Sequence, residues 1–174
     1  MNLLALLSLV VIGPVDSDAV ERVSRAAVVA QISGQPLLVL LDGGGGSVQE
    51  GGEIIAALEK IPRATCYVAD EAASMSAQIF VAAHCHRVMR QGAKLLFHLP
   101  HADIRNATYV DLTRYAGQLE AVSRAVCEQI EYGTSWTVPT SICLDLLVGL
   151  PPGEFWEVSA TAALHLHMVD EVVP

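Results

Sequence analysis

The sequence contains few charged side chains, and basic ones are the scarcest. Only 17% of its 174 residues are charged, and ten Lys and Arg against nineteen Asp and Glu give a net charge of −9. The two lysines are Lys60 and Lys94. A nucleic-acid-binding surface needs clustered basic side chains, so we expect no nucleic-acid partner. With 52% hydrophobic residues, residues 1–174 are expected to fold as one domain and to bury further apolar surface in subunit contacts.

Long hydrophobic segments and clustered cysteines are also missing. Residues 3–12 are nearly all apolar but too few to cross a bilayer, no basic residue precedes them, and Gly13-Pro14 follows. We therefore expect a buried strand there, not a signal peptide, and no membrane partner. No Cys-x-x-Cys occurs, so buried free thiols and a cytoplasmic location are expected. The cysteines are Cys66, Cys85, Cys127 and Cys143.

Strand and helix patterns alternate up to about residue 83. Residues 37–41 form a continuous aliphatic run, which is typical of a strand covered on both faces. The alternation predicts an α/β fold, with a parallel sheet and helices on both of its faces. The predicted strands are residues 9–12, 37–41, 65–69, 87–89, 95–98 and 169–173. The predicted helices are one capped by Asp16, Ser17 or Asp18 and ending near residue 32, then 47–59, 72–83, 108–132, 141–148 and 159–168.

The glycine-rich segment 42–47 lies between a predicted strand and a predicted helix. Glycine lets backbone N–H groups approach a ligand, and a helix N-terminus favours negative charge. The Gly-Lys-Ser/Thr of a Walker loop and the spacing of a dinucleotide fingerprint are both absent. A plain turn and an oxyanion-binding loop remain open.

Two serines and one histidine are candidates for nucleophilic chemistry. Ser74 and Ser76 lie near the start of an apolar helical segment, where a serine is either a helix cap or a nucleophile favoured by the helix dipole. Spacing alone does not choose between them. His98 closes a predicted strand and is either a general base or a structural histidine.

Two His-x-His pairs raise the question of a metal site. They are His84 with His86 and His165 with His167. Such a pair points both rings one way only on a strand, and both segments look partly helical. No metal site and no cofactor are predicted.

Taken together, the candidate segments resemble the Clp protease proteolytic subunit family. Segment 42–48 is similar to that family's Asn-Ser-Pro-Gly-Gly-Ser-Val. Residues 72–77, Ala-Ala-Ser-Met-Ser-Ala, are similar to its nucleophile segment Ala-Ala-Ser-Met-Gly-Ala, and residues 95–100, Leu-Leu-Phe-His-Leu-Pro, to its Met-Ile-His-Gln-Pro. The segments share the family's order and spacing, and shorter matches extend the resemblance over nearly the whole chain.

The resemblance implies a fold, a site and an activity. The fold would be the crotonase-like αβ superhelix, with residues 108–132 as its protruding handle helix. Ser74 would be the nucleophile, His98 its base, and the backbone N–H groups of Gly46 and Met75 the oxyanion hole. The protein would be a serine endopeptidase of the ATP-dependent Clp type, hydrolysing unfolded polypeptides or peptides through an acyl-enzyme. Its subunits would form a heptameric ring or double ring, which the apolar stripe along residues 108–132 also favours.

The chain departs from the family in three places, as a short, divergent member such as a viral one would. Twelve residues precede Gly13, fewer than in the family, so docking of an AAA+ unfoldase is expected to be weak or absent. No glycine-rich strand follows His98. A gapless match puts Phe155 where the family has its acid, whereas one inserted residue puts Glu154 there. We expect Glu154 to be the third catalytic residue.

Several alternatives stay open. Asp145, Glu157 or a Ser-His dyad could replace Glu154 in the triad. The whole chain could be a ring subunit with the same fold and weak or no activity. A Ser-Lys peptidase related to signal peptide peptidases would need Lys60 or Lys94, and a crotonase-type acyl-CoA enzyme would not need a reactive Ser74.

Overall fold

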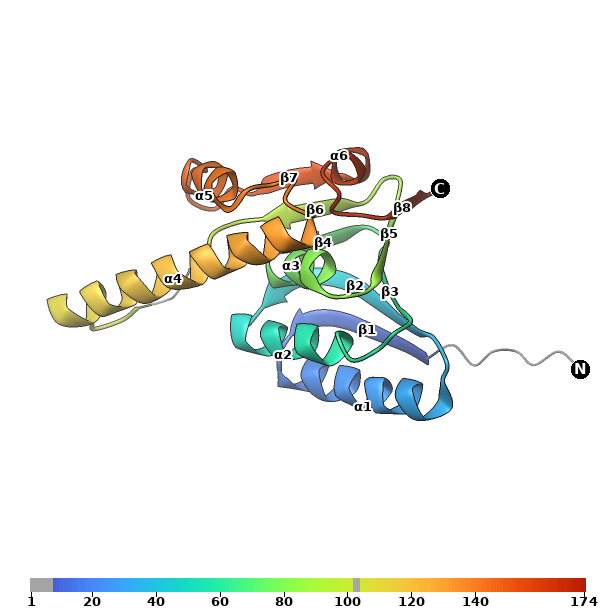
Figure 1. Cartoon of the computed structure of the whole chain (residues 1–174). Coiled ribbons are helices and arrows are strands. Elements are labelled where there is room, and N and C mark those ends of the chain that lie inside the picture. Colours follow the sequence, from blue (N-terminus) through green and yellow to red (C-terminus); the bar gives the residue numbers. More distant parts are fainter. Residues whose placement is uncertain (1–7, 102–103) are drawn as a thin grey trace, which may run out of the picture.

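A curved eight-stranded sheet organises the protein, whose computed structural model describes residues 8–101 and 104–174 (Figure 1). The strands are β1 (Ser8–Val15), β2 (Leu37–Gly46), β3 (Ala64–Val68), β4 (Glu71–Ala73), β5 (His86–Arg90), β6 (Lys94–Phe97), β7 (Trp156–Ser159) and β8 (Glu171–Val173). The helices are α1 (Ser17–Ser33), α2 (Val48–Leu58), α3 (Met75–Ala82), α4 (Tyr109–Gly133), α5 (Thr140–Val148) and α6 (Ala160–His165). Along the sheet the order is β7-β6-β4-β2-β3-β5-β8, and β1 pairs with β2 off this path.

Strand β2 joins the two halves of the sheet. Its first residues pair with β3, while Gly43 pairs with Ala72 of β4 further along. All pairings are parallel except that of β6 with β7. Gly43 also lies close to β1, since a Cβ at this position would be 2.5 Å from the carbonyl oxygen of Gly13. The glycine-rich segment is therefore the end of a strand and not a plain turn.

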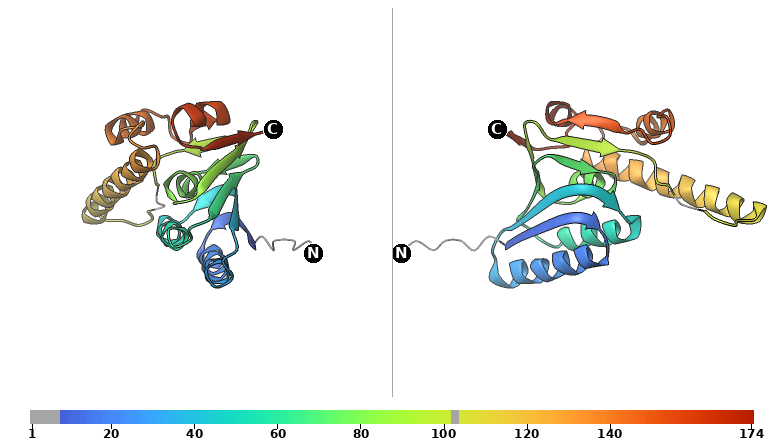
Figure 2. Two further views of the ribbon diagram at one scale, coloured as in Figure 1. Left: turned by 45° about the vertical axis from the view of Figure 1, so that its right-hand side comes forward. Right: turned by 180° about the vertical axis from the view of Figure 1, so that it is seen from behind.

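Helices α1, α2 and α3 lie on one face of the central strands, and the opposite face of β1 and β2 is open (Figure 2). Burial consequently alternates along β1, where Leu9 and Val11 are 58% and 47% exposed. In β2, Leu38 and Leu40 are only half-buried. The expectation that residues 37–41 are covered on both faces is wrong for this chain, because its aliphatic run also supplies an open apolar face.

Most predicted helices and strands are found, and the differences surround the serine segment. Ala72 and Ala73 form the short strand β4 instead of a first helical turn, and α3 begins only at Met75. Strand β7 was not predicted; it pairs antiparallel with β6 and ends at Ser159. The helix predicted over residues 159–168 is shorter and forms only α6, from Ala160 to His165. Residues 75–81 of α3 are all buried, so this helix lies at the centre of the core.

Helix α4 extends away from the rest of the molecule (Figure 1). Thr108 caps its N-terminus in a reciprocal capping box with Asp111, and the hydrogen bonds from Thr108 lower the pKa of the Asp111 carboxyl. Only the C-terminal half of α4 is buried, at Ser123, Val126, Cys127 and Ile130. The large apolar side chains exposed on its first half are Tyr109, Val110, Leu112 and Tyr115. Within the described residues, no helix combines the length and the hydropathy needed to cross a bilayer.

The four cysteines form two disulfides, so the expectation of free thiols is wrong. Cys66 on β3 is bonded to Cys85, with Cα atoms 5.8 Å apart, and Cys127 on α4 to Cys143 on α5, with Cα atoms 5.6 Å apart. Strands β3 and β5 are neighbours and α4 packs on α5. Tertiary structure therefore brings together cysteines that are widely spaced in the sequence. The cytoplasmic location rested partly on free thiols and stays a prediction.

Arg87 on β5 ties the C-terminal segment to the core. Its guanidinium donates to Asp170 Oδ1 at 2.8 Å and to the carbonyl oxygen of Gly133 at 2.6 Å, and the side chain is only 12% exposed. Burial alone would raise the pKa of Asp170, but the hydrogen bonds and positive charge of Arg87 outweigh it. The pKa of Asp170 is therefore held below its usual value.

We expect Asp170→Asn to lower the free energy of unfolding at neutral pH by about 1–2 kcal/mol, a value reduced because the carboxylate is 36% exposed. The pKa of Asp170 is lower in the folded than in the unfolded state. Its contribution is thus complete above about pH 4 and is lost as the pH falls through the folded pKa. Urea unfolding of both proteins across this range should give stability curves that converge at low pH. Curves that stay parallel would contradict the assignment.

Candidate active site

Three neighbouring parallel strands end at one edge of the sheet and bring the three candidate segments together. Strand β2 ends in the glycine segment, β4 ends just before Ser74, and β6 ends just before His98. Ligands of parallel sheets bind beyond the carboxyl ends of the strands. A cavity of about 630 Å³ lies there, lined among others by Gly46, Ser74 and His98.

Ser74 occupies the turn between β4 and α3 in a strained conformation. Its φ of 54° and ψ of −124° are rare for a residue with a side chain. The Ser74 N–H donates to the carbonyl oxygen of Leu96 on β6 at 2.7 Å, and the Gln78 N–H donates to the carbonyl oxygen of Ser74 at 3.1 Å. Such strain persists where surrounding contacts impose it, and a sharp strand-to-helix turn that exposes a serine hydroxyl is a known device for presenting a nucleophile.

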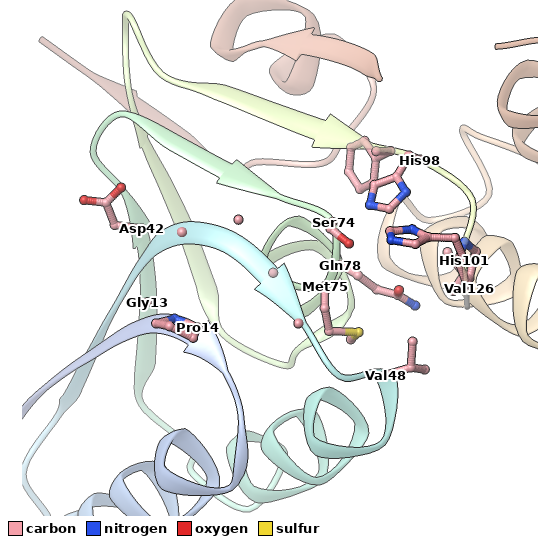
Figure 3. Close-up of a pocket in the computed structure, with 16 residues that line it drawn as sticks. Gly13, Pro14, Asp42, Val48, Ser74, Met75, Gln78, His98, His101 and Val126 are labelled. Atoms are coloured by element: carbon pink, nitrogen blue, oxygen red, sulfur yellow. The ribbon is translucent and has the colours of Figure 1, made fainter. Parts of the chain in front are cut away.

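The structure distinguishes the two serines by their surroundings. Ser74 is half-buried, lines the cavity, and points its hydroxyl toward the rings of His98 and His101 (Figure 3). Ser76 is fully buried in α3, and its hydroxyl has no hydrogen-bond partner among the described residues. Only Ser74 is placed to meet a substrate.

His98 lines the cavity, and its Nε2 has no hydrogen-bond partner among the described residues. Its Nδ1 lies 2.7 Å from the carbonyl oxygen of Leu99. A carbonyl can only accept, so Nδ1 carries the proton and Nε2 of the neutral ring is left to accept one. The ring of His101 stands beside it, with centroids 5.4 Å apart. His98 therefore has the tautomer that a general base for Ser74 requires.

Gly45 makes the closest approach to Ser74. A Cβ at Gly45 would lie 2.6 Å from Ser74 Cβ and 2.7 Å from the backbone nitrogen of Met75, and φ there is +89°. Gly46 lines the same cavity and lies against the carbonyl oxygen of Val15. Met75 is the first residue of α3, so its N–H has no partner within the helix. Only glycine lets β2 pass this close to the serine turn.

No carboxylate among the described residues is hydrogen-bonded to His98. Phe155 instead sets its ring edge-on against the imidazole, with centroids 5.0 Å apart. Glu154 is exposed and lines a second cavity of about 430 Å³, to which His98 also contributes. Glu157 lies 2.8 Å from Lys94, whose pKa its hydrogen bond and negative charge raise. Asp145 is exposed on α5.

Three of the four histidines in the two His-x-His pairs contact other neighbours. His86 Nε2 lies 3.2 Å from Glu171, His165 Nδ1 lies 2.7 Å from the carbonyl oxygen of Thr161, and His167 Nδ1 lies 3.2 Å from the Thr137 hydroxyl. In the part of the chain that the structure describes, no group of three or more His, Cys, Asp or Glu side chains is arranged to hold a metal ion.

The sequence comparisons agree with this arrangement. The Clp protease family matches residues 2–140, about four fifths of the chain. The chain belongs to the Clp protease family. Clp proteases are, in general, serine peptidases that work as oligomeric rings. A comparison with curated protein sequences finds no match. The matched range contains the glycine segment, Ser74 and His98 and ends before Glu154, and the role of each of these residues stays a prediction.

Sequence reasoning missed three residues of the cavity. Gln78 could have been found, because it follows Ser74 by four positions on a helix and is polar in an apolar segment. His101 had no such signal, since it follows His98 in an irregular segment. Gly45 was one of four equivalent glycines until the structure showed which of them meets Ser74.

We expect Gly45→Ala to displace Ser74 and Gly44→Ala to leave it in place. The Gly45 Cβ would collide with backbone and side-chain atoms of the serine turn, whereas nothing lies within 4 Å of a Cβ at Gly44. Forcing a side chain into that positive-φ position costs about 1–3 kcal/mol, and a displaced nucleophile loses about 100-fold or more in rate. Thermal unfolding and the rate of Ser74 labelling by a fluorophosphonate measure the two effects. Equal behaviour of the two variants would show that the close approach is unimportant.

Proposed function

We propose that the protein is a serine endopeptidase that hydrolyses unfolded polypeptides or peptides through an acyl-enzyme, inside a ring-shaped oligomer. The observation that carries the proposal is the strained turn at Ser74, which points the hydroxyl toward a histidine with a free ring nitrogen. Membership of the Clp protease family supports the same activity. The catalytic residues are Ser74, His98 and Glu154, and the oxyanion hole is formed by the N–H groups of Gly46 and Met75.

The proposed reaction follows from the chemistry of these groups. His98 Nε2 takes the proton of the Ser74 hydroxyl as the oxygen attacks the peptide carbonyl carbon. The carbonyl oxygen becomes negative and is stabilised by the backbone N–H groups that face it. The imidazolium then returns the proton to the leaving amine, the acyl-enzyme forms, and water attacks it by the same route. Each step uses groups at the cavity that β2, β4 and β6 enclose.

Glu154 is proposed as the third residue because it shares a cavity with His98. In the structure Phe155 lies against the ring, and Nδ1 donates to the Leu99 carbonyl. A shift of Phe155 away from His98 would let the Glu154 carboxylate take this hydrogen bond and stabilise the imidazolium. The other acids have weaker claims, since Glu157 is paired with Lys94.

Assembly into a ring is supported by exposed apolar surface. The first half of α4 extends away from the sheet and carries exposed Tyr109 and Leu112 (Figure 1). The outer face of β1 adds Leu9 and Val11. Monomeric proteins rarely leave such patches uncovered. We propose that the fold is the crotonase-like superhelix, that α4 is its handle, and that seven subunits close a ring, alone or stacked in pairs.

Two alternatives are disfavoured by particular contacts. A Ser-Lys peptidase needs a lysine beside Ser74, but no lysine lines the cavity, and Lys94 is paired with Glu157. An inactive ring subunit has no need of the strained turn that places Ser74 in one cavity with His98.

A fluorophosphonate is expected to label the wild type and Ser76→Ala, but not Ser74→Ala. Removing the Ser76 hydroxyl takes away a buried group without a hydrogen-bond partner, so Ser76→Ala should also be at least as stable as the wild type. Intact-protein mass spectrometry measures the labelling, and release of short fluorogenic peptides measures the activity. Labelling that persists in Ser74→Ala would overturn the assignment of the nucleophile.

Glu154→Gln is expected to reduce peptide hydrolysis by orders of magnitude. In Ser-His-Asp proteases, loss of the charge of the acid lowers turnover about 10⁴-fold. Glu157→Gln is the matched control, since it breaks only a half-exposed ion pair with Lys94. Steady-state kinetics of the two variants decide the point. Full activity in Glu154→Gln would remove Glu154 from the triad and leave Asp145 or a Ser-His dyad, in which the Leu99 carbonyl orients His98.

Light scattering is expected to give a mass several times that of the 18.5 kDa chain, with sevenfold for a single ring. Leu112→Glu places a charge within the exposed apolar stripe of α4 and should shift the protein toward smaller species. Gln118→Glu adds the same charge at another exposed position of α4 and should not. A monomeric wild type at micromolar concentration would argue against the ring.

A further inference from the structure

Gln78 places a polar group in the wall of the cavity next to the nucleophile. It lies in the first turn of α3, and its backbone N–H donates to the carbonyl oxygen of Ser74 at 3.1 Å. Gln78 lines the cavity together with Met75 and Val126, and its carboxamide reaches into it beneath His101 (Figure 3). A substrate whose carbonyl carbon meets Ser74 has its nearest side chain within reach of this carboxamide.

The carboxamide of Gln78 is held by a second glutamine. Its Nε2 donates to Oε1 of Gln129 on α4, one helical turn beyond Val126. Gln78 is only 4% exposed, which is rare for glutamine. The hydrogen bond uses one of its two N–H groups and leaves its Oε1 without a donor among the described residues. The pocket wall thus offers one acceptor and one donor, both fixed in place.

The charged residues around the cavity, and the lack of basic ones, determine which substrate side chains the pocket can accept. No lysine or arginine lines it, and Asp42 adds a negative charge at the end formed by Gly13 and Pro14. A carboxylate entering the pocket would find no lysine or arginine among these residues and would face the amide oxygen of Gln78. An apolar side chain would cover that oxygen and leave it without a hydrogen bond, which is unfavourable. A neutral carboxamide can donate to Oε1 and accept from the remaining N–H.

We propose that Gln78 sets the specificity of the site, and that the preferred residue on the acyl side of the cleaved bond is glutamine or asparagine. This inference rests on the proposed peptidase function, because the preferred residue is defined by its position next to the cleaved bond. It concerns a binding pocket, however, so it can be tested without catalysis. Glutamine, methionine and glutamate at this substrate position have nearly the same size and shape. Glutamine presents a carboxamide to Gln78, methionine an apolar group, and glutamate a carboxylate.

The test measures binding of three peptides that differ only in this residue to the Ser74→Ala variant, by isothermal titration calorimetry. The glutamine peptide is expected to bind about tenfold more tightly than the methionine peptide, and the glutamate peptide most weakly. In Ser74→Ala with Gln78→Met, methionine should become the preferred residue. Ser74→Ala with Gln91→Met is the matched control, because Gln91 is exposed in a distant turn. It should keep the original order.

Each outcome bears on one statement. Four results would overturn the role of Gln78. They are equal binding of the glutamine and methionine peptides, tightest binding of the glutamate peptide, an order unchanged by Gln78→Met, and no binding of any peptide. A different result is that the glutamine preference is found in binding, but the wild type neither reacts with a fluorophosphonate nor cleaves any peptide. That result overturns the peptidase function and leaves the specificity of the pocket in place. Cleavage by the wild type, with kcat/KM in the same order as binding, supports both.

Discussion

The close approach of two backbone segments, the end of β2 at Gly45 and the turn at Ser74, is the constraint on which the site depends. A single additional carbon atom at Gly45 would come within 2.8 Å of three different atoms of the serine segment. From the other side, the Leu96 carbonyl on β6 accepts the N–H of Ser74. Backbone contacts to both neighbouring strands therefore hold Ser74 at a φ of 54°, and the strain persists because these contacts over-determine the turn. The direction of the hydroxyl follows from the sheet and not from side-chain packing.

The sequence predicted the order of the site but not its contacts. The order of glycine segment, serine and histidine was predicted from the resemblance to the Clp protease family, and the parallel strands β2, β4 and β6 place all three at one edge of the sheet. For helix α1 the sequence offered three caps and an end near residue 32, and the structure selects Asp16 as the cap and ends the helix at Ser33, before Gly34 in the left-handed conformation. Strand β4 is one glutamate and two alanines, residue types that favour a helix, so its strand character comes from pairing with β2 and β6. The disulfides and the bond between Gln78 and Gln129 depend on tertiary contacts that local pattern cannot contain.

The orientation of His98 shows how a base can be prepared before its acid is in place. A triad acid has two tasks, to fix the tautomer of the histidine and to stabilise the imidazolium that forms. The Leu99 carbonyl performs the first, because it can only accept the proton on Nδ1. It carries no full negative charge, so it performs the second poorly. The edge of Phe155 occupies part of the space beside the ring. A carboxylate at Nδ1 would therefore differ from the carbonyl mainly by lowering the energy of the His98 imidazolium. Because the imidazolium forms during the reaction, this difference affects turnover more than substrate binding.

Helix α4 connects the surface proposed for assembly to the pocket proposed for specificity. Its first half is exposed and apolar, while its second half supplies Val126 to the cavity and Gln129 to the carboxamide of Gln78. The Cys127–Cys143 bond fixes that second half to α5, and the Arg87 guanidinium holds its C-terminal end at Gly133. A helix anchored in this way holds Gln129, and with it the carboxamide of Gln78, in a fixed position. On the proposed function, one rigid element therefore carries both the surface for assembly and the support of the pocket, so that subunit contacts and the specificity of the site depend on the same helix.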